Sequence, residues 1–293
     1  MPINIGWASI LGRMELRGEG SMGKVGSIGG CAILNGIILM DTASGRVVCG
    51  VRNGDGTVHA EKLVFLSKAA TFLKIWTDRI VRRLPAAARL LNTLSMLLLS
   101  ILMLFAGLGK GLSFKSPWSF RKAAAFALLA AAIYTYIFFE TYVTLLLSLG
   151  FILFFARDMG IMLGYHGAEH KVINMYESGM EVPEATIEAI RPFSRIHLRC
   201  GTNLAAVLVP LILIEYFAVE SGQLFNLSGG IDLLLSFLLL LLGVEIFKRL
   251  QGKRLQWLLK PGLLLQKGVT TREPDDGQLE VALETLKVLT GKG

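Results

Sequence analysis

Residues 123–164 read AAAFALLAAAIYTYIFFETYVTLLLSLGFILFFARDMGIMLG, a run in which apolar residues far outnumber polar ones. About 20 such residues cross the hydrocarbon core of a membrane as a helix, so the run has roughly the length of two crossings. Glu140 lies near its middle, where the chain would turn. The stretch predicts two membrane-spanning helices, at about 122–139 and about 142–163.

Further apolar blocks predict spans at 203–219 and 230–247. The block at 90–109 has Lys and Arg residues on both sides, so we interpret it as a re-entrant or interfacial hairpin, with a fifth span as the alternative. The sequence therefore predicts a mainly α, polytopic membrane protein with about four transmembrane helices.

Composition and charge point the same way. The 293 residues are 53% hydrophobic with a net charge of +8, and the mean hydropathy is +0.57. Lys and Arg gather near both ends and in residues 157–202, and are absent from the turns near Glu140 and Glu220. The positive-inside rule then predicts a multi-pass protein of the cell membrane, with both termini cytoplasmic and lipid as its partner. No aromatic-basic motif indicates nucleic-acid binding.

The region before these blocks predicts a small β-hairpin. Val47, Val48 and Val51 belong to a candidate strand, Asn53–Gly56 is a strong turn signal, and a return strand begins at Thr57. The predicted organisation follows the chain in five parts: a poorly ordered extension 1–24, a β-rich cytosolic segment 25–66, a basic amphipathic interfacial helix 67–89, a membrane domain 90–250 with a cytosolic metal-site loop 164–202, and a cytosolic tail 251–293 with a short helix.

Three of the four histidines fall in this loop. His166 and His170 are four residues apart, so a helix would present both imidazoles on one face, where they can reach one ion. Glu169 completes an H-x-x-E-H pattern and is placed to take a proton from water.

A second half-motif joins His197 to Cys200, a spacing that also suits a metal. The loop between the two motifs is long enough to bring them together. We therefore predict a divalent transition metal, zinc in first place, with His166, His170, His197 and Cys200 as its ligands. Glu177 is too far along a continuous helix to share the ion and is expected to be solvated.

These motifs resemble the YqhQ-like bacterial membrane family, a domain of unknown function usually labelled as a predicted metal-dependent enzyme. The resemblance covers about residues 28–290 and is carried by four stretches: Tyr165–Lys171, Tyr176-Glu177, His197–Thr202, and Pro261–Leu263 with Thr270–Pro274. The N-terminal part departs from the family pattern, since Cys31 and Asn35 stand where the family has Gln and Glu, and Ser95 lies near another Glu position.

The first hypothesis is a metal-dependent membrane enzyme that hydrolyses its substrate, with Glu169 as general base. The alternative is a non-catalytic scaffold in which four protein ligands saturate a structural metal. A transporter is the weaker alternative, because it requires ionisable residues inside spans, for which only Glu215, Glu140 and Asp232 qualify.

Overall fold

The computed structural model describes residues 28–83, 94–95, 98–99, 102–103, 141–220, 229–251 and 255–291. The predicted extension 1–24, the span at 122–139 and most of the block at 90–109 lie outside these residues. The strands are β1 (Ile28–Ile33), β2 (Gly36–Asp41), β3 (Arg46–Arg52) and β4 (Val58–Lys62). The longer helices are α2 (Val64–Arg83), α5 (Thr141–Glu177), α7 (Gly201–Glu220), α8 (Gly229–Leu250) and α10 (Asp276–Thr290). The short helices are α6 (Ile187–Ile190), η1 (Gln256–Leu259), α9 (Lys260–Leu265) and the π-helix η2 (Gln266–Thr270).

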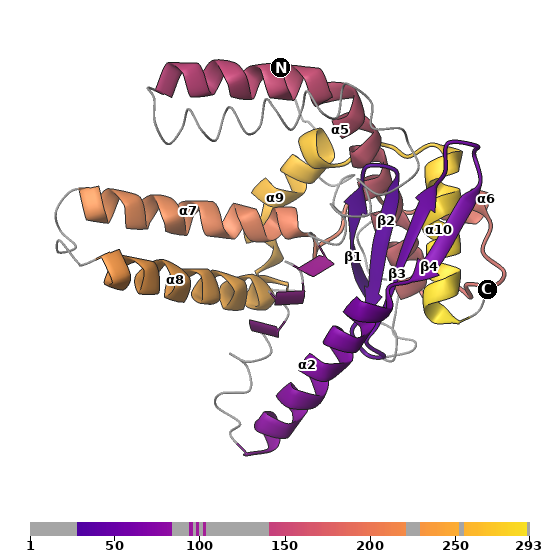
Figure 1. Cartoon of the computed structure of the whole chain (residues 1–293), viewed down its shortest axis with the longest axis horizontal. Coiled ribbons are helices and arrows are strands. Elements are labelled where there is room, and N and C mark those ends of the chain that lie inside the picture. Colours follow the sequence, from indigo (N-terminus) through magenta and orange to yellow (C-terminus); the bar gives the residue numbers. More distant parts are fainter. Residues whose placement is uncertain are drawn as a thin grey trace, which may run out of the picture.

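The four strands form one antiparallel sheet in the order β1-β2-β3-β4 (Figure 1). The hairpin predicted around Asn53–Gly56 is present as β3 and β4. Two more strands precede it, because a turn at Leu34-Asn35 returns β1 onto β2. The sheet is therefore twice the size of the predicted hairpin.

Both faces of the sheet are covered in the described chain. Ile37 and Leu39 point to one face, where they pack in a core cluster with residues of α5 and α10. Ile38 and Met40 point to the other face and pack with Leu66 of α2. This alternation follows from the period of two in a strand. The sheet is thus the middle layer between α5 with α10 on one side and α2 on the other.

Helix α10 joins the end of the chain to the sheet. Asp275 caps its first turn in a capping box with Gln278, and Gly291 ends it with a positive φ of 71°. The Gln278 side chain also donates to Ile161 O of α5 (3.0 Å). The predicted C-terminal helix is therefore present, and it is part of the main core.

Helices α7 and α8 run side by side, away from the sheet (Figure 1). Gly243 of α8 permits a close approach, because a Cβ there would overlap Leu208 of α7. Apolar side chains on the outer faces of the pair are exposed, among them Ile214, Phe217, Leu234 and Leu238.

The predicted spans 142–163, 203–219 and 230–247 fall on α5, α7 and α8. Within the described residues, none of the helices combines the length and the apolar character that a membrane crossing requires.

The prediction of a mainly α, polytopic membrane fold at a multi-pass location in the cell membrane is therefore wrong for the described part of the chain. What that part contains is a four-stranded sheet with helices on both faces. The cytoplasmic placement of the termini and of the loop depended on the same spans and is corrected with them.

Candidate metal centre

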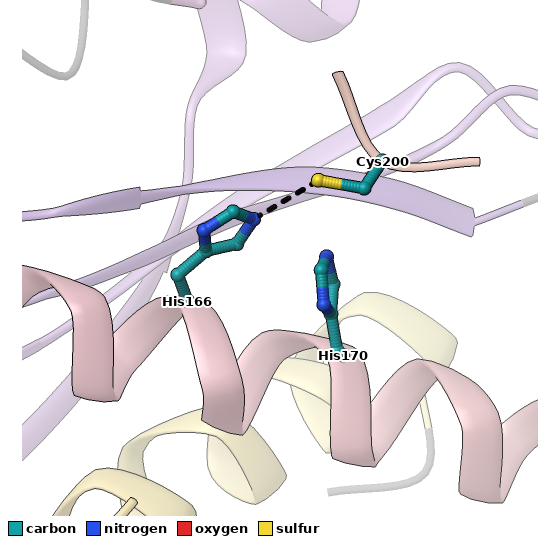
Figure 2. A group of neighbouring side chains, drawn as sticks. All are labelled: His166, His170 and Cys200. Carbon is teal, nitrogen blue, oxygen red and sulfur yellow. Dashed lines mark hydrogen bonds between the residues drawn. The ribbon is translucent and has the colours of Figure 1, made fainter. Parts of the chain in front are cut away.

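Helix α5 carries two histidines on one face. His166 and His170 are one turn apart, and their ring centroids are 4.4 Å apart. Figure 2 shows both rings rising from the same side of the helix toward the segment that contains Cys200. This is the arrangement that the spacing of four residues predicts.

Cys200 lies immediately before α7, so its sulfur is at the N-terminal end of that helix. Thr202 N–H donates to Cys200 Sγ (3.5 Å), and the His166 Nε2 atom is 3.3 Å from the same sulfur (Figure 2). One ligand atom each from His166, His170 and Cys200 lie within 4.8 Å of one another. Ligand atoms of a tetrahedral zinc ion are about 3.5 Å apart, so the three side chains would have to draw slightly closer to hold such an ion.

Backbone carbonyls fix the orientation of both rings. His166 Nδ1 is 2.7 Å from Thr270 O, and His170 Nδ1 is 2.7 Å from Arg195 O. A carbonyl oxygen only accepts, so Nδ1 carries the proton in each ring and Nε2 keeps its lone pair. This is the tautomer and the outer hydrogen bond that metal-bound histidines show.

Burial keeps the imidazoles neutral. It lowers the pKa of His170 to about 3, with the neighbouring His166 adding to the effect, and it also lowers the pKa of His166. Neutral imidazole is the form that binds metal. Burial raises the pKa of the Cys200 thiol, so an ion that binds there must displace the thiol proton.

Glu169 is buried next to this group, with 4% of its surface exposed. Its Oε2 atom has no hydrogen-bond partner among the described residues. Burial raises the pKa of Glu169 to about 8. Its Oε1 atom is 3.0 Å from the position that a Cβ at Gly30 would occupy. The carboxylate therefore lies between α5 and strand β1.

His197 lies beside the group but is engaged elsewhere. Its ring centroid is 5.6 Å from that of His170, its Nδ1 accepts from Arg199 N–H (3.3 Å), and its Nε2 is 3.4 Å from Glu177 Oε2. Arg199 binds the other oxygen of Glu177. The structure thus brings together three of the four predicted ligands. Glu177, expected to be solvated, ends α5 as a mostly buried partner of His197 and Arg199.

The segment before α7 is tied to both sides of the site. Asn174 of α5 donates to Ser194 O (2.8 Å) and Ile196 O (3.1 Å). Gln266 of η2 accepts from His197 N–H (2.9 Å) and donates to His197 O (3.1 Å). These bonds set the position of Cys200 relative to α5.

Several residues that shape the site were missed in the sequence. The carbonyls of Arg195 and Thr270 leave no signal in side-chain identity, and Gln266 belongs to no recognised motif. Gly30 had a signal, because it lies in the Gly-Gly pair before Cys31 that the family resemblance singles out.

Comparison with known proteins finds relatives without an assigned activity. Residues 66–292 match the family described as "Protein of unknown function (DUF1385)". The chain is similar to a protein of Bacillus subtilis (strain 168) called "Uncharacterized protein YqhQ", with 35% identity over 158 residues, 51% of this chain and 48% of the relative. The match thus spans about half the length of that relative. No solved structure matches the chain.

Proposed function

The chain belongs to the DUF1385 family, a family of unknown function, so we propose its function from its own residues. We propose that the protein is a metal-dependent hydrolase in which His166, His170 and Cys200 hold one transition-metal ion. The observation that carries this proposal is the pair of Nδ1–carbonyl hydrogen bonds. They leave the Nε2 lone pair of each ring available, and the His166 Nε2 atom is 3.3 Å from the Cys200 sulfur.

Zinc suits this set of two imidazoles and one thiolate. Three protein ligands leave a fourth position for water or substrate, as in catalytic zinc sites. When bound, an ion of this kind acts as a Lewis acid toward an oxygen atom of water or substrate.

Glu169 supplies the acid–base group. Its Oε2 atom is buried and has no hydrogen-bond partner among the described residues, so the ionised form of Glu169 can accept a proton from water and pass it to a leaving group. Because burial raises the pKa of Glu169 to about 8, this ionised form becomes the main one as the pH rises through 8. Excluding solvent around the carboxylate strengthens each of these interactions. Together with an open position on the ion, this arrangement favours hydrolysis over a purely structural role.

A structural metal site is the second candidate, favoured by the low exposure of His170 (2%) and Cys200 (8%). It needs a fourth protein ligand, and His197 is the nearest candidate. His197 would have to leave Glu177 and Arg199 to bind. If the site is that of a hydrolase with three ligands, the His197→Ala variant should keep most of its metal. If the site is structural with four ligands, His197→Ala should lose the metal, as His170→Ala does.

The first prediction is therefore about metal content. Purified full-length protein should hold about one zinc ion per chain by elemental analysis, because three donors of suitable chemistry converge. His166→Ala, His170→Ala and Cys200→Ala should each lose most of it. His59→Ala, on the exposed edge of the sheet, and Cys49→Ala, in the core on the far face, are the matched controls and should keep it. Unchanged zinc in His170→Ala would show that the cluster binds no metal.

A further inference from the structure

Strand β1 is an edge strand of the sheet that the structure describes, and its Gly30 lies beside Glu169. The hydrogen-bonding pattern of the sheet shows which backbone groups of β1 face away from β2. Arg52 N–H donates to Asn35 O, so the odd-numbered residues of β2 bond to β3 and the even-numbered ones to β1. The register pairs those even residues with Gly29, Cys31 and Ile33. The N–H and C=O groups of Ile28, Gly30 and Ala32 therefore point away from the sheet.

Gly30 is the point where this edge meets the site. It is exposed, whereas Glu169 beside it is buried. A side chain at this position would overlap Ile38 O and approach Glu169 Oε1 to 3.0 Å. A glycine within a strand often marks a place where another backbone approaches closely. Here the close neighbours are Ile38 O and the Glu169 side chain of the protein itself, so Gly30 places the edge of β1 directly beside the Glu169 carboxyl group.

The two edges of the sheet differ in charge. Strand β4 carries His59, Glu61 and Lys62, and charged residues on an edge strand discourage pairing with other chains. Strand β1 has the sequence IGGCAI, with no charge at all. The uncharged edge is therefore the one beside the metal centre.

We propose that the substrate is a polypeptide in extended conformation, which adds to the edge of β1 as a further strand and presents a peptide bond to the metal centre. This rests on the proposed function. Main-chain bonds to Gly30 and Ala32 provide affinity for any extended sequence. A chain added about 4.8 Å from β1 runs past the Gly30–Glu169 contact.

The reaction is the hydrolysis of that peptide bond. A water oxygen forms a bond to the carbonyl carbon, and the carbon–nitrogen bond breaks. Glu169 takes one proton from the water and delivers it to the leaving nitrogen. The products are a carboxylic acid and an amine, and no other reactant is consumed.

The experiment uses zinc-loaded full-length protein with β-casein as the unfolded polypeptide and p-nitrophenyl acetate as a small ester that needs no strand addition. The variant Ala32→Pro removes an outward N–H on β1. Ala60→Pro is the matched control, since Leu63 N–H donates to Val47 O and the same alternation directs Ala60 outward on β4. Proline is tolerated at such edge positions. Ala32→Pro should keep zinc and lose casein cleavage by about tenfold or more, and Ala60→Pro should match wild type.

Hydrogen exchange gives a readout that does not depend on how Ala32→Pro folds. With casein added to the Glu169→Gln protein, amides in residues 28–33 should exchange more slowly, and those in residues 58–62 should not change. If wild type binds zinc and hydrolyses the ester but leaves casein intact, or if exchange in 28–33 is unaltered, the peptide proposal is overturned while the proposed function stands. A protein with neither zinc nor ester hydrolysis overturns both.

Discussion

Glu169 connects parts of the site that are distant in sequence. It precedes the ligand His170, contacts the position of Gly30 on β1, and adds to the effect of burial in raising the pKa of the Cys200 thiol. The Glu169 carboxyl group is thus coupled electrostatically to the Cys200 sulfur, and it lies beside the edge strand on which we propose the substrate binds.

The prediction at this residue separates proton transfer from metal binding. Glu169→Gln keeps the size of the side chain and removes its capacity to accept a proton. Zinc content and melting temperature should remain close to wild type, because Glu169 is not among the three ligands. Ester hydrolysis should fall about 10²–10⁴-fold, the usual effect of losing a general base. Glu184→Gln, at an exposed position, is the control and should retain full activity.

A different pattern would assign Glu169 another role. Joint loss of zinc and thermal stability in Glu169→Gln would mean that the carboxylate supports the ligands from outside. Full retention of zinc, stability and hydrolysis would remove it from the mechanism.

Among the elements, the segment that leads into α7 decides the geometry of the centre. It supplies Cys200 as a ligand and Arg195 O as the acceptor that orients His170. The sequence predicted both half-motifs from side-chain chemistry, because helical spacing fixes which residues of α5 share a face. The sequence did not predict that His197 stays outside the ligand group. Its contacts with Glu177 and Arg199 depend on the tertiary structure.

The strands show a second limit of sequence patterns. Ile37, Ile38, Leu39 and Met40 are buried on alternate faces, so β2 is a continuous apolar run without the alternation that marks a half-buried strand. The hairpin of β3 and β4 was predictable because Asn53–Gly56 is a strong turn. Apolar content alone favoured membrane spans for α5, α7 and α8, and it gave no sign that α5 also packs on a sheet.

Gln266 provides the prediction for this segment. Its side chain is fully buried and makes two hydrogen bonds with the His197 backbone, so Gln266→Leu leaves buried polar groups without these partners. The substitution should cost about 1–3 kcal/mol of unfolding free energy and weaken zinc affinity about tenfold or more, because Cys200 is no longer held in place. Gln256→Leu is the control, since that side chain bonds only to Gln251 O among the described residues. Unchanged zinc affinity, measured by competition with a chelator, would show that Gln266 has no part in positioning Cys200.

At the scale of the whole molecule, the C-terminal helix α10 packs against the sheet formed by the N-terminal strands β1–β4. Leu279, Val281 and Leu286 of α10 share one core cluster with Ile37 of β2 and with Ile173 of α5. The helix that carries both ligand histidines therefore packs on the same core as the edge strand and the last helix. Residues that maintain this core hold the metal centre and the β1 edge in one arrangement.

Gly50 of β3 tests this packing. A Cβ there would overlap Thr285 Oγ1 and lie 3.0 Å from Thr285 Cβ, and the Thr285 side chain is already hydrogen-bonded to Val281 O (2.6 Å) within α10. Gly50→Ala should therefore push α10 from the sheet, at a cost of about 1–3 kcal/mol and a melting temperature lower by roughly 2–12 °C. Adding Thr285→Ala should recover part of this loss, because the two residues are in contact and their effects do not add. Gly29→Ala is the matched control, since a Cβ at Gly29 meets no atom within 4 Å and the substitution should be neutral or slightly stabilising. If thermal unfolding followed by circular dichroism gave the same melting temperature for Gly50→Ala and Gly29→Ala, α10 could not pack on β3 as closely as the structure shows.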